Sequence, residues 1–325
     1  MNGKNWMIVW LAAGMAALPR GVLAWGPEGH AVVGDLAAGL LTPEAKRQVK
    51  SILGNKRLGD YEVSSWPDEI RGAQEYEKRY PGNGRWHFVE FNVSEKYDED
   101  FELKLPGDGH DIVTQVGRWQ KELAAKGNRM PRRRDALKFL VHFTADLHQP
   151  LHCAYRYGDM GGNMIPVHSF QGRNYRISAE DAPEHLPDLH SVWDECMVYE
   201  LMAGRSRPAF AKALQEGIGG EQLRRWSQGP PFDWATDSYW RARKQAYRWA
   251  NGENLPFKWA RPGMDLTSEN YIDARLPLVQ EQLQKAGVRL ARLLNEALDP
   301  DYAPPAVGES ALPPDGGKAP AAGGG

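Results

Sequence analysis

The stretch VHFTADLHQPLH, residues 141–152, combines a helical pattern with side chains that bind metals. His142 and Asp146 are four residues apart, and the same spacing recurs at His190 and Asp194 in the segment LHSVWD. Two residues four apart share one face of a helix. Imidazole and carboxylate together are ligands of zinc. The two pairs therefore predict a site that holds more than one metal ion.

The residues around this stretch have the apolar spacing of a helix. Over residues 134–149 the apolar side chains share one broad face, the His142–Asp146 pair is offset from it, and Pro150 ends the helix. His152 follows soon after, close enough to turn toward a neighbouring metal. Further helical patterns cover residues 42–53, 110–126, 187–202 and 271–298, the first with Thr42 as its N-cap.

Strand patterns are scarce. Only NYRISA alternates in the way a strand does, and WHFVEFNV is compatible with an extended chain. Residues 25–302 contain neither an internal repeat nor a linker, and they are long enough for one domain with a full core. We therefore predict a mainly α fold in a single domain. Residues 303–325 are rich in Pro, Gly and Ala, and we predict a disordered tail.

The first 24 residues have the pattern of a secretory signal peptide. Lys4 provides the positive start, residues 6–18 form the apolar run, and Val22-Leu23-Ala24 suits cleavage. The apolar run is too short to cross a bilayer, although an uncleaved anchor is the alternative reading. Cleavage would make Trp25 the new N-terminus, in the segment WGPEGH. We expect a secreted or periplasmic protein.

The charge balance excludes one class of nucleic-acid binder. The chain has 40 Lys and Arg against 42 Asp and Glu, a formal charge of −2. Loss of Lys4 and Arg20 with the signal peptide gives 38 − 42 = −4. A chain this acidic does not bind nucleic acid through a generally basic surface. Any phosphate chemistry requires a local source of positive charge, and bound metal is the obvious one.

Six short motifs, in order, resemble those of the zinc-dependent type I nucleases, the S-one/P-one family of single-strand nucleases and 3′-nucleotidases. The motifs are WGPEGH, SSWPDEIR, WHFVEFN, VHFTADLHQPLH, GDMGGN and LHSVWD, within residues 25–194. RLARLLN, at residues 289–295, fits the closing helix of that family. The resemblance implies a helical fold of the phospholipase C/nuclease type with a cleft for three zinc ions.

The resemblance also implies which residues hold each zinc ion. The first ion would take Asp68, His87, His142 and Asp146. The second would take His152, His190 and Asp194. The third would take His30, the shared Asp146, and the amino nitrogen and carbonyl oxygen of Trp25. A free α-amine is a competent ligand near neutral pH, so signal cleavage would complete the third site.

Further roles follow from the same resemblance. Arg71 and Asn163 would contact the phosphate, and Asp146 would orient the attacking water. Phe88 would stack on a nucleobase, for which core packing is the alternative. Glu90 would contact the base, but the best-known fungal members have Asp there, which leaves the base preference open. His148 is expected to be structural or to support a ligand, and His110, His168 and His185 are given no role.

The predicted function is a zinc-dependent endonuclease. It would hydrolyse single-stranded DNA and RNA to 5′-phosphate products and act on 3′-mononucleotides. Stacking needs an unpaired base, which accounts for selectivity toward single strands. No protein partner and no stable membrane association are expected.

Two other functions remain open at this point. A zinc-dependent phospholipase C shares the fold, but it uses Glu where this chain has Asp194, and His30 lies only five residues after Trp25. A non-catalytic zinc-binding protein would not need Arg71, Phe88 or Asn163, so a chain with all three favours an enzyme. The two cysteines, Cys153 and Cys196, lie near the proposed second zinc in sequence, and either a disulfide or a thiolate ligand is compatible with them.

Overall fold

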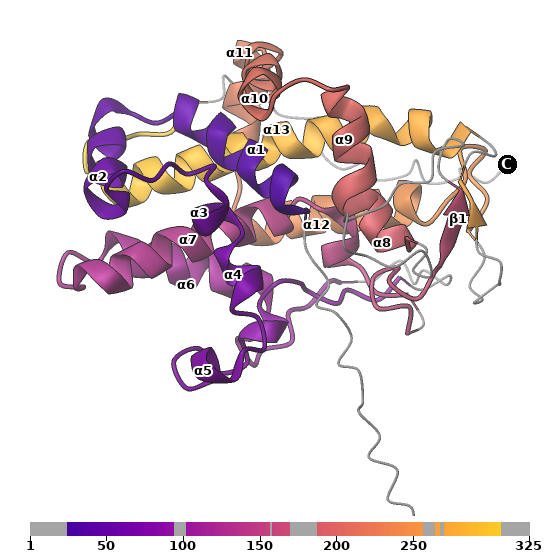
Figure 1. Cartoon of the computed structure of the whole chain (residues 1–325), viewed down its shortest axis with the longest axis horizontal. Helices are drawn as coiled ribbons and strands as arrows, with labels where there is room; N and C mark the ends of the chain where they lie inside the picture. Colours follow the sequence, from indigo (N-terminus) through magenta and orange to yellow (C-terminus); the bar gives the residue numbers. More distant parts are fainter. Residues whose placement is uncertain are drawn as a thin grey trace, which may run out of the picture.

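The protein is a bundle of α-helices around one long C-terminal helix (Figure 1). The computed structural model describes residues 25–93, 102–156, 158–169, 187–255, 264–266 and 270–306. The helices of its first half are α1 (Pro27–Gly39), α2 (Pro43–Leu53), α3 (Tyr61–Ser64), α4 (Trp66–Glu69), α5 (Gln74–Glu77), η1 (Asn83–Arg85), α6 (Ile112–Ala124), α7 (Met130–Asp146) and η2 (Pro150–Cys153).

The second half is also mainly helical. Its helices are α8 (Leu189–Ser191), η3 (Val192–Cys196), α9 (Met197–Met202), α10 (Arg207–Glu216), α11 (Gly220–Trp226), α12 (Pro231–Arg241), η4 (Ala242–Ala246) and α13 (Tyr271–Leu298). The strands β1 (Val167–Ser169) and β2 (Met264–Asp265) pair in parallel. The predicted mainly α fold is confirmed. The segment NYRISA lies outside the described residues.

Sequence signals explain where the helices begin and end. Thr42 caps α2 as predicted, because its Oγ1 accepts a hydrogen bond from Ala45 N at 3.1 Å. Asp111 caps α6 in the same way through Thr114 N, at 2.9 Å. Helix α7 ends at Asp146, before Pro150, which instead starts the short helix η2. The chain from Trp86 to Asn92 forms no strand. It is bridged to Tyr155 at Asn92, and Val89 N donates to His152 O at 2.8 Å.

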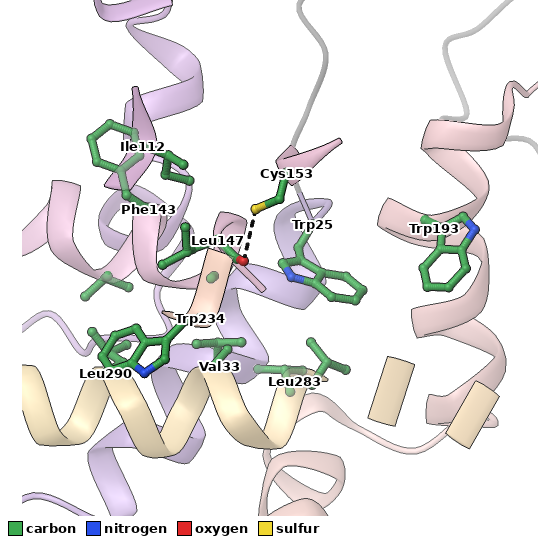
Figure 2. Close-up of a cluster of buried hydrophobic side chains, with 14 of the residues drawn as sticks. Trp25, Val33, Ile112, Phe143, Leu147, Cys153, Trp193, Trp234, Leu283 and Leu290 are labelled. Carbon is green, nitrogen blue, oxygen red and sulfur yellow. Dashed lines mark hydrogen bonds between the residues drawn. The ribbon is translucent and has the colours of Figure 1, made fainter. Parts of the chain in front are cut away.

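The core lies where α13 packs against α1, α6 and α7. One part of it is an aromatic cluster in which the Trp119 and Phe139 rings stack at 4.3 Å. Phe143 continues this cluster and meets the ring of His87 edge-on at 5.1 Å. Trp25, Val33 and Leu283 belong to the same core (Figure 2). The first residues of the domain are therefore packed against its last helix, and α7 presents its polar residues from a rigid apolar base.

No helix in the described part of the chain is long and apolar enough to cross a membrane.

Candidate metal centre

The predicted metal ligands come from distant segments that converge in the folded chain. Three groups of His and Asp side chains each have ligand atoms within 4.8 Å of one another. These groups are His30, His142 and Asp146; Asp68, His87 and His142; and His152, His190 and Asp194. The residues lie on α1, on α4, after η1, on α7, on η2, on α8 and on η3. The structure therefore brings together eight of the nine predicted ligands by their side chains, and Trp25 was predicted to bind through its backbone.

Asp68, His87 and Asp146 are arranged around His142. Its Nε2 lies 3.4 Å from Asp68 Oδ1 and 3.2 Å from Asp146 Oδ2. His87 Nδ1 faces the same two carboxylates, at 3.4 and 3.2 Å. All four side chains are buried, with side-chain exposures between 0 and 7 %. Two imidazoles and two carboxylates thus point at one small space.

Asp146 connects this group to the next. Its Oδ2 faces His87 and His142, whereas its Oδ1 lies 3.2 Å from His30 Nε2. The rings of His30 and His142 stack at 3.9 Å. The two oxygens of one carboxylate therefore face two different groups of ligands, which is the arrangement of a bridging ligand.

The N-terminal segment is held against the same region. The Trp25 indole is fully buried, and Gly26 N donates a hydrogen bond to Asp194 O at 2.9 Å. A Cβ on Gly26 would clash with the side chain of Glu195. These contacts fix the backbone of Trp25 and Gly26 beside η3, the helix that carries Asp194.

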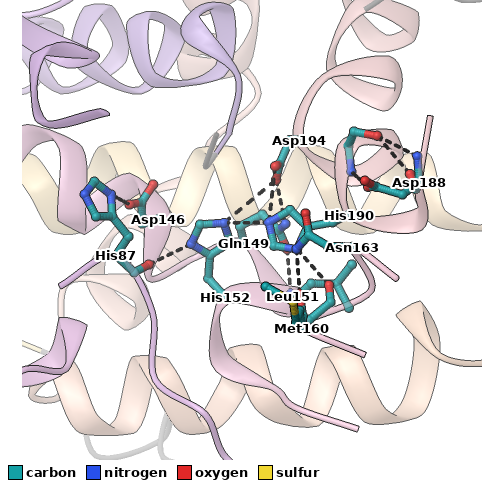
Figure 3. Close-up of polar contacts among 12 residues, drawn as sticks. His87, Asp146, Gln149, Leu151, His152, Met160, Asn163, Asp188, His190 and Asp194 are labelled. Carbon is teal, nitrogen blue, oxygen red and sulfur yellow. Dashed lines mark hydrogen bonds and ion pairs between the residues drawn. The ribbon is translucent and has the colours of Figure 1, made fainter. Parts of the chain in front are cut away.

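The group of His152, His190 and Asp194 lies next to His87, whose backbone oxygen faces the ring of His152 (Figure 3). His190 Nε2 lies 3.3 Å from Asp194 Oδ2 and 3.0 Å from His152 Nε2. His190 and Asp194 were predicted to share one face of an ordinary helix. The chain instead widens into a π-helical turn over Val192–Cys196, a feature that is frequent at functional sites. Asp188 starts this segment with a capping box to Ser191.

Backbone carbonyls orient three of the histidines. Nδ1 of His142 lies 2.8 Å from Ser64 O, and Nδ1 of His152 lies 2.7 Å from His87 O. Nδ1 of His190 lies 2.7 Å from Gly161 O. A carbonyl can only accept, so in each ring Nδ1 carries a hydrogen and Nε2 is the nitrogen left to face the ligand group. Metal-binding histidines are held in this way.

Residues 158–163, with the sequence GDMGGN, form a glycine loop that places the carbonyl that orients His190. Gly161 has φ +64°, and a Cβ there would lie 2.7 Å from Leu151 O and 3.3 Å from His190 Nδ1. Only glycine fits this backbone and this close approach. Asp159 Oδ1 fixes the loop by accepting hydrogen bonds from Arg156 N and Gly161 N, both at 3.1 Å.

Burial decides the charge of most of these histidines. It lowers the pKa of His30, His152 and His190, and it lowers the pKa of His87 to about 4. Burial acts on His142 in the same direction, but the charges of Asp146 and Asp68 outweigh it and raise the pKa of His142 to about 10. Neutral imidazoles are the form that binds metal. The carboxylates of Asp68 and Asp146 therefore favour a positive charge at this place, either the protonated imidazole of His142 or a metal cation.

The carboxylates are suited to a cation in another respect. Within the described part of the chain, Oδ1 of Asp68 and Oδ1 of Asp146 are buried and accept no hydrogen bond. A buried carboxylate oxygen without a donor is costly unless a cation faces it. The donor set of His and Asp side chains fits zinc. The structure thus contains three candidate metal-binding clusters.

Gln149 is a functional candidate that the sequence analysis did not single out. Its Nε2 donates to Asp194 Oδ1 at 2.6 Å, and its Oε1 accepts from Leu151 N at 2.5 Å. The side chain is fully buried. Gln149 therefore fixes the Asp194 carboxylate on the side of Oδ1. Its place between two ligands in DLHQPLH was the only signal in the sequence.

We expect Gln149→Ala to weaken metal binding by the His152 group about 10- to 100-fold, because the Asp194 carboxylate loses its fixed orientation. Zinc titration of the metal-free protein measures this. Gln120→Ala, at a half-buried glutamine on α6, is the matched control. Unchanged zinc affinity in Gln149→Ala would show that the hydrogen bond does not position Asp194.

His148 lies beside the ligands but faces away from them. Its Nδ1 lies 2.7 Å from Thr144 O, and its Nε2 lies 2.7 Å from Arg289 Nη1. Burial and the charge of Arg289 hold its pKa well below the usual value, so the ring is neutral and accepts from Arg289. These contacts tie the end of α7 to α13, in keeping with the structural role expected for this residue.

Arg71 and Phe88 lie together beside the group of Asp68, His87, His142 and Asp146. Arg71 Cζ lies 5.8 Å from the centroid of the Phe88 ring. Both side chains are half-buried, and Phe88 is not among the residues of the hydrophobic core. Burial lowers the pKa of Arg71, while the charges of Asp68, Asp146 and Asp194 act in the opposite direction. The guanidinium of Arg71 therefore interacts electrostatically with carboxylates of two groups, Asp68 and Asp146 in one and Asp194 in the other.

Glu90 and Asn163 do not belong to any of the three His and Asp groups. Glu90 is exposed. Asn163 is half-buried in the glycine loop, two residues after Gly161, and its Nδ2 donates to Met160 O at 2.5 Å. The amide of Asn163 is thus engaged by the loop itself.

The cysteines do not form the disulfide that the sequence left open. Cys153 and Cys196 are both free and buried. Burial raises the pKa of the Cys153 thiol, and it raises the pKa of the Cys196 thiol to about 12. Neither is part of a metal-binding group among the described residues.

Comparison with known proteins agrees with this geometry. The family model described as S1/P1 Nuclease matches residues 25–299. The chain belongs to the S1/P1 nuclease family. Like the named nucleases of this family, it is a phosphodiester hydrolase. The family expected from the six motifs is confirmed.

Plant and fungal relatives are similar over most of their length. The chain is 28% identical to Endonuclease 4 of Arabidopsis thaliana, over 86% of this chain and 91% of that protein. It is 28% identical to Nuclease P1 of Penicillium citrinum, over 84% and 97% of the two chains. Nuclease S1 of Aspergillus oryzae is 26% identical, over 88% and 96%.

Proposed function

We propose that this S1/P1-family hydrolase is a zinc-dependent endonuclease of single-stranded DNA and RNA. Its products would carry 5′-phosphates, and it would also remove phosphate from 3′-mononucleotides. The observation that supports this most is the convergence of three buried His and Asp groups beside the Arg71–Phe88 pair. The groups are suited to metal, the arginine to a phosphate and the ring to a base.

The three groups would hold three zinc ions. Asp68, His87, His142 and Asp146 would hold the first, and His152, His190 and Asp194 the second. His30, Asp146 and the backbone of Trp25 would hold the third. When bound, zinc lowers the pKa of water to about 7 and offsets negative charge on a phosphate. Two observations support this assignment. Buried oxygens of Asp68 and Asp146 accept no hydrogen bond among the described residues, and backbone carbonyls hold Nδ1 of His142, His152 and His190, so that Nε2 of each ring faces its group.

The side chains have distinct tasks in the proposed reaction. Asp146, which is shared by two groups, orients the attacking water. Arg71 and Asn163 donate to the phosphate oxygens, where negative charge increases in the transition state. Phe88 stacks on the base of the bound nucleotide and Glu90 contacts its edge. Only an unpaired base can stack on Phe88, which gives selectivity for single strands.

Processing completes the proposed site. We propose that residues 1–24 are removed during export, so that the protein is secreted or periplasmic and begins at Trp25. The backbone of Trp25 and Gly26 is already fixed beside Asp194. A free amino group at Trp25 is a nitrogen ligand, whereas the nitrogen of a peptide bond is a poor one.

Phe88→Ala tests the stacking role. We expect it to weaken binding of single strands by ~1–3 kcal/mol, the usual contribution of a base stack, and to leave the zinc content unchanged. Michaelis constants on single-stranded DNA measure the effect. Tyr302→Ala, at a half-buried aromatic residue that follows α13, is the control. An unaltered Michaelis constant in Phe88→Ala would mean that Phe88 serves packing only.

A substrate panel tests the proposed function as a whole. Single-stranded DNA, RNA, a 3′-mononucleotide and lecithin are assayed with and without a chelator. We expect chelator-sensitive hydrolysis of the first three and none of lecithin. Hydrolysis of lecithin alone would identify a phospholipase C. Bound zinc without any hydrolysis would identify a non-catalytic zinc-binding protein.

A further inference from the structure

A groove of about 790 Å³ lies away from the metal centre, between α6 and the start of α12. Val113, Gly117 and Lys121 line it from α6, and Pro231 and Phe232 line it from α12. From residue 113 to residue 125, the lining face of α6 extends over about 18 Å, at 1.5 Å per residue. A groove of that length can hold a stretch of extended polymer.

The charge of this region is opposite to that of the whole chain. Arg118 and Lys121 are exposed at the groove, and the third charged lining residue, Glu122, is paired with Arg132 at 2.8 Å. With Glu122 paired, the groove presents two exposed cations, whereas the chain as a whole carries a formal charge of −2. A localised positive charge of this kind attracts a polyanion.

Gly117 leaves open space on the face of α6 that lines the groove. It lies in the middle of α6 and lines the groove, and a Cβ there would meet nothing within 4 Å. Packing within the described chain therefore does not require glycine, and alanine would stabilise the helix. A bare backbone at the floor of a groove allows the close approach of a ligand.

The segment that carries the proposed base-binding residue packs against both helices that form the groove. Ile112, the first residue of α6, donates from its N to Phe88 O at 3.1 Å. At the other wall, the ring of Phe232 lies 6.1 Å from the ring of Phe91. The segment from Phe88 to Phe91 thus connects the edge of the metal centre to both walls of the groove.

We propose that this groove binds single-stranded nucleic acid at nucleotides beyond the one that is cleaved. Arg118 and Lys121 contact its phosphates, Phe232 provides an aromatic surface for a base, and Gly117 leaves room for the strand. This assignment rests on the proposed function, because it extends the path of the same substrate. It predicts that long single strands bind more tightly than dinucleotides.

The test measures binding, so it does not depend on hydrolysis. Zinc-loaded protein that begins at Trp25 is titrated with a fluorescent phosphorothioate oligothymidylate of about 20 nucleotides and with the dinucleotide. We expect Gly117→Leu, which fills the groove, to raise Kd for the long strand at least about fivefold, the equivalent of one base stack. It should leave Kd for the dinucleotide unchanged. Its melting temperature should not fall, because leucine is a good helix former.

Lys121→Ala tests the charge. Loss of one phosphate contact should reduce the slope of log Kd against log salt by about 0.7 for the long strand. Lys212→Ala is the control, since Lys212 is an exposed lysine on α10, on the opposite side of α13 from α6 (Figure 1). It should change neither Kd nor the slope.

Several results would overturn the proposal. The first is that the wild-type protein binds long and short strands with the same Kd. The second is that Gly117→Leu and Lys121→Ala bind the long strand with the Kd of the wild-type protein. The C-terminal segment is the competing occupant, because Gln228 Nε2 donates to Pro305 O at 2.9 Å beside the groove. If deletion of residues 307–325 abolished the effect of Gly117→Leu, the groove would hold that segment. If binding depended on the groove but no hydrolysis occurred, the proposed function would be wrong, whereas the proposal that the groove binds single strands would stand.

Discussion

A chain with one extra methionine before Trp25 is expected to fold normally and to cleave single-stranded DNA at least about 100-fold more slowly than the chain that begins at Trp25. The extra residue converts the proposed amine ligand to an amide and adds backbone where Gly26 is already packed against Glu195. His30 and Asp146 alone would then hold the third zinc. We expect at most two tightly bound zinc ions in this variant.

Turnover and zinc content of both chains measure this effect, and circular dichroism controls for folding. Intact mass must confirm that the extra methionine is retained. If the extended chain had wild-type turnover, Trp25 would not be a ligand, and its buried indole would serve the core alone.

Asp146→Asn is expected to have the second large effect. Asp146 faces His30 through one oxygen and His87 and His142 through the other, so its loss affects two proposed zinc ions. Asparagine keeps the shape but is a weak zinc ligand. We expect zinc to fall toward one ion per chain and kcat/KM on single-stranded DNA to fall by ~10³ or more.

Elemental analysis and initial rates check this prediction. Asp301→Asn, at an exposed carboxylate beyond α13, should leave both quantities unchanged. Full zinc content in Asp146→Asn would show that Asp146 does not bridge two ions.

The sequence predicted the elements with strong local signals. Thr42 and the apolar spacing of α6, α7 and α13 identified these helices, because caps and periodicity are local properties. Residues four apart gave the His142–Asp146 and His190–Asp194 pairs for the same reason. The grouping of all the ligands required the family resemblance, since no local rule connects His30 with His142.

Other features depend on tertiary contacts and could not be predicted. The π-helical turn at Asp194 and the hydrogen bond from Gln149 depend on how two distant segments meet. The hydrogen bond from Asn163 Nδ2 to Met160 O likewise depends on the folded loop, and the expected contact of Asn163 with the phosphate stays a prediction. The groove joins residues near 117 to residues near 231, which no periodicity relates.

The zinc content of the processed protein tests the central claim most directly. Protein that begins at Trp25 is purified without chelator, and its zinc is measured by elemental analysis alongside its activity on single-stranded DNA. The three His and Asp groups predict about three zinc ions per active chain. Active protein with one zinc ion or none would contradict the three-zinc account.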